Sequence, residues 1–153
     1  MRRATAADLP DVIALTRVAY APWVPVIGRE PLPMQADHGR AIAEHLIDIL
    51  DDQSGPIALI EMIPRVDHLW LENVAVHPDH QGKGLGRQLI SHAEATARAL
   101  GLPELRLLTN AAFAANLRFY GALGFIETGR TAFRGGFTAN FARNLVGPGS
   151  DKG

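Results

Sequence analysis

The fold is decided by the segment Val74-Ala75-Val76-His77-Pro78-Asp79-His80-Gln81-Gly82-Lys83-Gly84-Leu85-Gly86. An apolar strand pattern runs into a loop with several glycines, and a helical pattern follows at once. Glycines let successive backbone N–H groups point toward one place, and the helix N-terminus adds free N–H groups and a favourable dipole. The segment therefore predicts a site for a phosphate or pyrophosphate, with Lys83 and Arg87 adding positive charge.

Two other glycine-rich motifs fit this segment less well. A P-loop has the form GxxxxGK[ST], and no Ser or Thr follows Lys83. A dinucleotide fingerprint has the form GxGxxG, and Arg87 stands where its last glycine belongs. That fingerprint also expects an acidic residue at the end of the next strand, where this chain has Thr109-Asn110. A glycine-rich turn that binds nothing remains the alternative.

Working outward, periodicity and turn signals predict alternating strands and helices. One buried face is expected on a helix from Gly84 to Leu100, because apolar residues recur there at helical spacing and Gly101 follows. Helices are also predicted over 5–20, 35–44 and 113–123, and residues 21–33 are expected to be a proline-rich loop. Strands are predicted over 45–50, 57–63, 69–76, 105–109, 125–128 and 137–145.

This order predicts an α/β domain with a mixed sheet of about six to seven strands, flanked by about four helices. A single domain is expected over residues 1–146, followed by a flexible tail over 147–153. The chain has 153 residues and a net charge of −1 from 15 basic and 16 acidic side chains. That balance argues against a nucleic-acid partner. No stretch reaches the ~18 apolar residues of a membrane span, so a cytoplasmic protein is predicted.

The chain contains no cysteine. Disulfides, cysteine-ligated zinc, iron–sulfur clusters and an acyl-cysteine intermediate are therefore excluded. His77 and His80 have the spacing of a weak chelating pair, but no further ligand cluster accompanies them, so no metal is predicted. They are expected to be solvent-facing loop residues.

Two motifs resemble those of a known family. The pattern Gln81-x-x-Gly84-x-Gly86 resembles the acetyl-CoA pyrophosphate signature of the GNAT superfamily of N-acetyltransferases. The stretch from Asn116 to Phe125 (NLRFYGALGF) is similar to a second motif of that family, in which an Asn is followed by Y-x-x-x-G-F. Residues 2–15 also resemble the family's usual opening. The likeness spans nearly the whole chain, and the 21–33 loop is its least typical part.

The resemblance implies a twisted mixed sheet whose central parallel strands, about 69–76 and 105–109, splay apart to admit the pantetheine arm of acetyl-CoA. It implies direct transfer of the acetyl group to an amine within a ternary complex. A backbone N–H at residue 74 or 75, freed by a β-bulge, would stabilise the negative oxygen of the intermediate. The expected cofactor-binding residues are Val74, Ala75, Val76, Gln81, Gly82, Lys83, Gly84, Leu85, Gly86, Arg87, Asn116 and Tyr120.

Tyr120 and Glu72 are the predicted catalytic residues. A tyrosine has an unperturbed pKa of about 10, so its hydroxyl can give a proton to a departing thiolate. Asn116 stands four residues earlier, on the same predicted helix face, and could bond to the cofactor arm. Glu72 could accept the amine proton directly or through water, and Glu61 is a weaker candidate. The alternatives are a core aromatic for Tyr120 and a solvated or paired acid for Glu72.

Trp23, Arg29 and Glu30 lie in the loop expected to cover the acceptor side, where Glu30 would attract an amine. A proline-stiffened surface loop is the alternative. The leading hypothesis is an N-acetyltransferase acting on a small molecule, amino-acid derivative or peptide amine. A non-catalytic acyl-CoA sensor and a nucleotide-binding domain are the competing hypotheses. Members of the resembled family are often dimers, so a homodimer is a further expectation, although the sequence fixes no symmetric interface.

Overall fold

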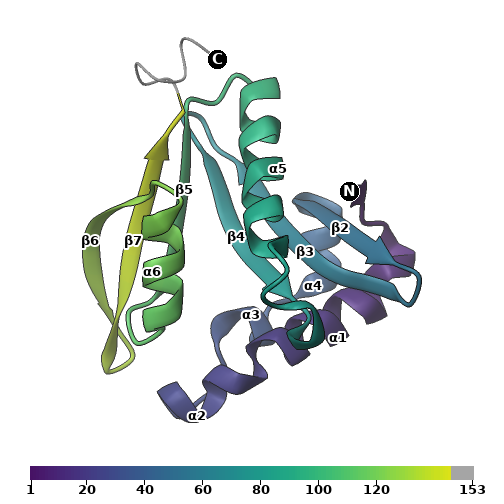
Figure 1. The fold of residues 1–153 in the computed structure, drawn as a ribbon, viewed down its shortest axis with the longest axis horizontal. Helices are drawn as coiled ribbons and strands as arrows, with labels where there is room; N and C mark the ends of the chain where they lie inside the picture. The colour runs from purple at the N-terminus through teal and green to yellow at the C-terminus, as the bar shows by residue number, and fades with distance from the viewer. Residues whose placement is uncertain (146–153) are drawn as a thin grey trace. The chain divides into compact units, whose positions relative to one another are not determined.

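The computed structural model describes residues 1–145, so the predicted tail over 147–153 lies outside the described residues. Seven strands form one mixed sheet in the order β1-β2-β3-β4-β5-β7-β6, which confirms the predicted α/β class (Figure 1). The strands are β1 (Arg2–Arg3), β2 (Leu46–Asp52), β3 (Gly55–Pro64), β4 (Leu69–Val76), β5 (Glu104–Asn110), β6 (Ile126–Phe133) and β7 (Gly136–Asn144). The α-helices are α1 (Leu9–Tyr20), α2 (Val24–Ile27), α3 (Leu32–Gln35), α4 (His38–Glu44), α5 (Leu85–Ala99) and α6 (Ala114–Ala122), with 3-10 turns η1 (Ala6–Asp8), η2 (Ala21–Trp23) and η3 (Pro78–His80).

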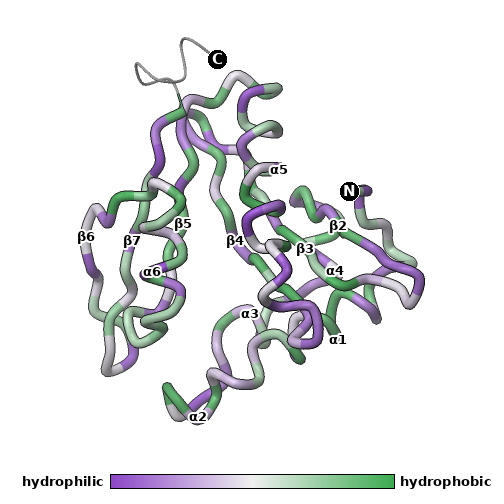
Figure 2. The backbone as a smooth tube through the Cα atoms, in the orientation of Figure 1, coloured by the Kyte–Doolittle hydropathy of each residue, from purple (hydrophilic) through white to green (hydrophobic). Residues whose placement is uncertain are grey.

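The chain groups into two compact units. The first unit comprises residues 1–63 and 72–91, and the second comprises 64–71 and 92 onward. In the first unit residues of α1 and α4 pack on the β2–β3 hairpin, in which β3 is largely hydrophobic and the far end of the hairpin is hydrophilic (Figure 2). The core there contains Val12, Leu15, Ile47, Ile49 and Leu59, each with at most 4% of its surface exposed.

The start of α1 is fixed by a branched ion-pair network. Thr5 and Asp8 form a capping box at η1, in which the Thr5 backbone N–H donates to an Asp8 carboxylate oxygen at 2.8 Å. The Arg2 guanidinium binds the same carboxylate through two nitrogens, each 3.0 Å from an oxygen, and also contacts Asp51 at 2.6 Å. The hydrogen bond from Arg2 lowers the pKa of Asp8 from 3.8 to about 2. The network ties β1, β2 and the first helix together.

Replacing Asp8 with Asn should lower the free energy of unfolding at pH 7 by about 1 kcal/mol, because a helix cap and an ion pair are weakened together. A lowered folded-state pKa stabilises the protein above the unfolded value of 3.8, and this contribution disappears as pH falls toward 2. Urea unfolding should therefore show a smaller difference in stability between the wild type and Asp8→Asn at pH 3 than at pH 7. Asp11→Asn, an exposed acid on the same helix, is the control; an equal loss there would contradict the network's role.

Residues 21–33 were predicted to be a loop, and that prediction is wrong in part. The segment contains η2 and α2, and α3 begins at Leu32. Pro22 and Pro25 lie in the first turns of these short helices, where a missing N–H is tolerated, rather than acting as breakers. Gly28 ends α2 in the left-handed conformation, with a φ of 73°. Periodicity could not find helices this short.

The second unit contains the antiparallel strands β5, β7 and β6 together with α6. Strand β6 runs over eight residues instead of the four predicted. Seven of its eight residues are exposed, so it lacks the apolar alternation from which a strand is predicted. The parallel pairing of β4 with β5 joins Leu69 with Leu105 and Trp70 with Arg106. Along the rest of β4 no further pair with β5 is present among the described residues.

Candidate active site

The glycine-rich loop of the first unit has the backbone expected of an anion site. Gly82 and Gly84 both have a φ of +80°, a conformation that L side chains rarely adopt. The Gly84 carbonyl accepts the Gln88 N–H at 3.0 Å, so Gly84 occupies the N-cap position of α5. The N–H groups of the first turn, from Leu85 to Arg87, lie ahead of this first helical bond. They are therefore available to a bound anion.

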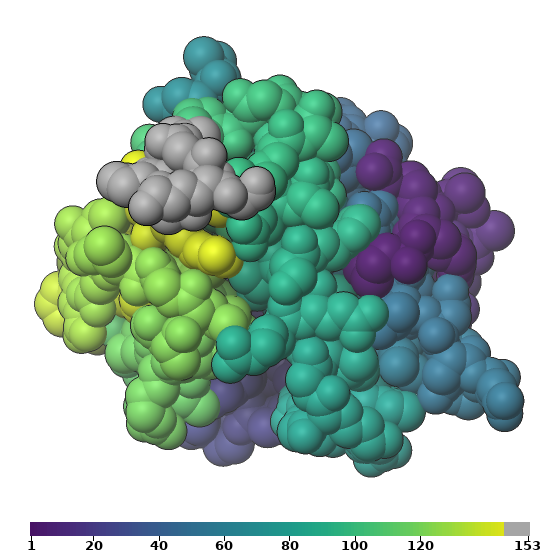
Figure 3. Space-filling model, turned by 45° about the horizontal axis from the view of Figure 1, so that its top comes forward, coloured from purple at the N-terminus to yellow at the C-terminus, as the bar shows by residue number. Residues whose placement is uncertain are grey.

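The loop is polar and open to solvent. Gln81, Gly82, Lys83, Gly84 and Arg87 are all exposed. The segment leading into α5 is strongly hydrophilic in Figure 2, and the same stretch lies on the open surface of its unit in Figure 3. The cationic side chains of Lys83 and Arg87 are thus free to meet a ligand phosphate from solution.

The histidines before the loop hold it in place. The His77 backbone N–H donates to the Ile57 carbonyl at 2.8 Å, and its ring Nδ1 accepts the Asp79 N–H at 3.1 Å. The His80 ring lies 3.6 Å from a carboxylate oxygen of Asp52. Both histidines are partly buried, with 33% and 23% of their side chains exposed, so each faces solvent only in part. Among residues 1–145 no group of three or more His, Asp or Glu side chains is arranged to hold a metal ion.

The C-terminal half of β4 offers a backbone edge. The His77 N–H points toward β3, and successive residues of a strand direct their backbone groups to opposite sides. Val74 and Val76 therefore direct their N–H and C=O groups away from β3. Burial alternates without interruption along β4, so a regular strand gives this edge and the predicted bulge is not needed.

The carbonyl oxygens on this edge already have partners. The Tyr20 hydroxyl lies 3.3 Å from the Val74 carbonyl oxygen, and the Gln81 side chain donates to the Val76 carbonyl at 3.4 Å. Side chains of the same unit therefore contact both acceptors, and the single Tyr20 proton is shared between the Val74 carbonyl and the closer Asn73 oxygen. The N–H donors of the edge at Val74 and Val76 suit a ligand that brings carbonyl oxygens, as a thioester and a pantetheine amide do.

Tyr120 is the best-packed candidate in the second unit. Its ring lies 5.2 Å from Phe119, 5.6 Å from Phe125 and 6.0 Å from Phe141, measured between ring centroids. Only 7% of Tyr120 is exposed, and burial raises the pKa of its hydroxyl above the ordinary value of 10. The oxygen therefore keeps its proton at neutral pH. The alternative of a core aromatic is confirmed for the ring, and the catalytic role of the hydroxyl stays a prediction.

Asn116 connects α6 to the end of β5. Its side-chain amide donates to the Thr109 hydroxyl at 3.3 Å. Thr109 is 8% exposed, and Asn110 accepts the Ala112 N–H through its side chain at 2.9 Å. These bonds fix the turn between β5 and α6. Asn116 thus has a structural partner, and its predicted bond to the cofactor stays a prediction.

Glu72 and Glu61 have different environments in the first unit. Glu72 is exposed and lies on the opposite face of β4 from buried Asn73, as predicted. Glu61 is 4% exposed, and His45 Nδ1 lies 2.7 Å from its carboxylate. Burial raises the pKa of Glu61, and the negative charge of Glu72 raises it further, while His45 and His38 lower it. The two acids are therefore close enough for their charges to interact.

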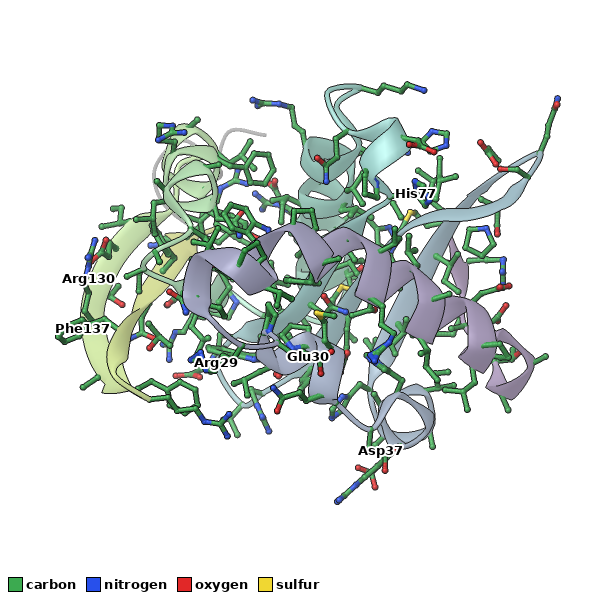
Figure 4. The ribbon with its side chains drawn as sticks, turned by 90° about the horizontal axis from the view of Figure 1, so that it is seen from below. Arg29, Glu30, Asp37, His77, Arg130 and Phe137 are labelled. Carbon is green, nitrogen blue, oxygen red and sulfur yellow. The ribbon has the colours of Figure 1, made fainter. Side chains whose placement is uncertain are left out.

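The three predicted acceptor-side residues lie in the helical segment after α1. Trp23 ends η2, while Arg29 and Glu30 lie between α2 and α3 (Figure 4). The Glu30 carboxylate lies 3.7 Å from the Arg17 guanidinium, and its backbone carbonyl accepts a hydrogen bond from Gln35 at 2.8 Å. Glu30 is thus partly neutralised, which weakens the expected attraction for an amine.

Sequence reasoning missed the side chains that hold the edge of β4. The Tyr20 hydroxyl donates to the Asn73 side-chain oxygen at 3.0 Å, and the Asn73 amide donates to Thr16 at 3.3 Å. These residues lie more than fifty positions apart, and no local motif connects them. A polar Asn next to Glu72 in a mainly apolar strand pattern was the one available signal, because a buried amide requires partners.

Comparison with known proteins agrees with this geometry. The profile of the Acetyltransferase (GNAT) family matches residues 13–125. The chain belongs to the GNAT family of acetyltransferases. It is therefore an acyltransferase, its co-substrate is acetyl-CoA, and its reaction is acetyl transfer to an amine. The family assignment favours the acetyl-CoA interpretation of the glycine-rich loop over the nucleotide-binding one.

Its relatives include named enzymes. It is 38% identical over 122 residues to the [ribosomal protein bS18]-alanine N-acetyltransferase of Escherichia coli K12, covering 78% of this chain and 76% of that protein. The match to the Salmonella typhimurium enzyme of the same name spans about half of that relative, 51% of its length at 36% identity. The L-amino acid N-acyltransferase MnaT of E. coli is 41% identical over 61 residues, which cover 40% of this chain and 36% of MnaT.

Solved structures show the same fold. The PaiA N-acetyltransferase from Thermoplasma acidophilum, crystallised in complex with coenzyme A, superimposes with a TM-score of 0.80. That likeness covers 94% of this chain and 96% of the PaiA chain at 18% identity. The mixed GNAT sheet predicted from the two motifs is therefore confirmed. No helix within residues 1–145 is both long and apolar enough to cross a membrane.

Proposed function

We propose that this acetyltransferase modifies the α-amino group of an amino acid or of a peptide N-terminus. The relatives named above act, by their names, on an alanine of a ribosomal protein and on L-amino acids. Both acceptors carry an α-amino group, which narrows the broader amine class predicted from the sequence. Arg29, which is partly buried, and exposed Glu30, which is partly neutralised by Arg17, are the charged groups proposed to lie on the acceptor side.

The proposed reaction is a direct transfer. Glu72 takes a proton from the ammonium form of the acceptor, and the freed nitrogen lone pair attacks the thioester carbon. The carbonyl oxygen becomes negative and accepts the Val74 N–H. When the intermediate collapses, the C–S bond breaks, and the electron pair leaves on the sulfur. The Tyr120 hydroxyl gives its proton to that thiolate and regains one from solvent, while the proton on Glu72 passes to solvent.

The backbone edge of β4 is the observation that carries this proposal. Its N–H donors lie on the strand that leads directly into the glycine-rich loop, so one segment of chain supplies groups for the thioester and for the pyrophosphate. A β4 edge with a purely structural role would not explain why glycines in the left-handed conformation follow the strand. The acyl-CoA sensor remains the competing function, because it would use the same contacts without turnover.

A test of the activity measures CoA release with acetyl-CoA and a panel of acceptors. Free amino acids, peptides with an N-terminal alanine, the same peptides with a blocked N-terminus, and polyamines make up the panel. Release with free or peptidic α-amines but not with blocked peptides supports the proposal. Thermal stabilisation by acetyl-CoA with no release under any acceptor would establish the sensor instead. A cytoplasmic location and a homodimer stay predictions.

The base can be assigned by a matched pair of variants. Glu72→Gln should lower kcat/KM at pH 7 by about 100-fold, because one general base is removed. The loss should shrink as pH rises, since a growing fraction of the acceptor then arrives already neutral. Glu61→Gln removes the charge of the neighbouring acid while keeping an oxygen for His45, and should cost less than about threefold. If Glu61→Gln lost about 100-fold in kcat/KM and Glu72→Gln less than about threefold, the general base would be Glu61.

A further inference from the structure

We propose that Tyr20 is a positioning residue for acetyl transfer, whose hydroxyl fixes the Val74 peptide so that its N–H faces the thioester carbonyl. This inference rests on the proposed role of the Val74 N–H. Tyr20 is the last residue of α1 and packs against the core of the first unit. Its hydroxyl lies 3.0 Å from the Asn73 side-chain oxygen and 3.3 Å from the Val74 carbonyl oxygen.

These two contacts are made by the groups that precede and follow the Val74 N–H along the chain. The Val74 nitrogen belongs to the peptide unit between Asn73 and Val74. Asn73 is held on the near side through its side chain, and the Val74 carbonyl is held on the far side. Because the groups on both sides of this peptide unit are contacted by one hydroxyl, the two residues that carry it are restrained against moving relative to α1. The direction of the Val74 N–H is therefore set by α1 as well as by the pairing of β4 with β3.

The anchor for this arrangement is buried. Thr16 is 0% exposed and Asn73 is 4% exposed, and they share a hydrogen bond of 3.3 Å. Thr16 and Tyr20 are four residues apart in α1, so they face β4 from the same side of the helix. Asn73 thus receives one hydrogen bond from Tyr20 and donates another to Thr16. A buried amide bonded at both ends has one favoured orientation, because turning it would place its oxygen and its NH2 group against the wrong partners.

Precise direction matters because an oxyanion donor acts only when it points at the place where charge develops. Removing one such donor costs roughly 100- to 1000-fold in turnover, and a donor that is misdirected but not removed costs less. The substrate still binds through the glycine-rich loop, which makes no contact with Tyr20 in the hydrogen bonds described. Loss of the hydroxyl should therefore act on kcat and leave the KM for acetyl-CoA nearly unchanged.

Tyr20→Phe tests the inference, because it removes the hydroxyl and keeps the ring. The infrared band of the carbonyl of bound acetyl-CoA, labelled with ¹³C, reports hydrogen bonding to its oxygen. In the wild type this band should lie at lower frequency than in free acetyl-CoA, and in Tyr20→Phe it should move most of the way back. The kcat should fall about tenfold with acetyl-CoA affinity within twofold. Ser91→Ala, an exposed hydroxyl removed from α5, is the control and should change neither quantity.

If Tyr20→Phe unfolds, substitutions of Thr16, which accepts the hydrogen bond of the Asn73 amide, give a second test. Thr16→Ser keeps a hydroxyl for Asn73 and should retain the band shift, whereas Thr16→Val removes it and should lose part of the shift. A wild-type band at the position of free acetyl-CoA would overturn the role of the Val74 N–H itself. A wild-type shift that Tyr20→Phe retains, with kcat unchanged, would overturn the positioning role and leave the proposed function intact.

Discussion

Tyr120→Phe should reduce kcat by about 100-fold while leaving the affinity for acetyl-CoA unchanged. The phenylalanine ring fills the same space between Phe119, Phe125 and Phe141, so the packing of the second unit survives. Only the hydroxyl is lost, and with it the proton for the departing thiolate. Burial raises the pKa of Tyr120, so the hydroxyl is protonated and able to donate at neutral pH.

Turnover and binding are measured separately for this variant, by CoA release and by titration with acetyl-CoA. Phe125→Leu is the matched control, since Phe125 packs on Tyr120 and is 4% exposed. It should cost about 1 kcal/mol of stability and change kcat by less than about threefold. If Tyr120→Phe retained wild-type turnover, Tyr120 would be only a packing residue and the proton would come from elsewhere.

Gly84→Ala should raise the KM for acetyl-CoA at least about tenfold through the pyrophosphate contacts. Space is not the obstacle, because nothing lies within 4 Å of a Cβ built at this position. The backbone is the obstacle, because Gly84 has a φ of +80° that an alanine adopts only at a cost of about 1 kcal/mol. The relaxed loop would turn its N–H groups away from the anion.

Gly101→Ala provides a closely matched control. Gly101 follows the other end of α5, has a φ of +72° and also has nothing within 4 Å of a built Cβ. Both variants should lose similar thermal stability, measured by calorimetry. Only Gly84→Ala should lose affinity for acetyl-CoA, measured by titration. Equal affinities in the two variants would show that the loop conformation does not contribute to binding.

What could be predicted from the sequence was what is encoded locally. The glycines at 82 and 84, the strand before them and the helix after them are adjacent, so one short segment carried the whole pattern. The Tyr20–Asn73 bond joins residues 53 positions apart, and only the folded chain brings them together. The burial of Glu61 beside His45 could not be predicted for the same reason, although the sequence indicates Glu61 as a weaker candidate for the base.

Other features were missed because their local sequence pattern is typical of a different structure or gives no signal. Prolines in 21–33 indicated a loop, yet at the first turn of a helix they cost nothing. Strand β6 was underestimated because both of its faces are exposed, which removes the alternation that burial imposes. His38 gave no signal in the sequence, and in the fold it is 5% exposed with neither ring nitrogen bonded to another described group.

The exposed strand β6 is an edge strand of the sheet, and edge strands can pair with other chains. It ends the sheet order, so one row of its backbone groups faces outward as a template for another chain. Two devices protect it: the pairing register shifts between Glu127 and Gly129, and the Arg130 guanidinium binds the Glu127 carboxylate at 2.8 Å. An interrupted, charged border pairs poorly with a second copy of itself. These two features disfavour pairing of the β6 edge with a further chain.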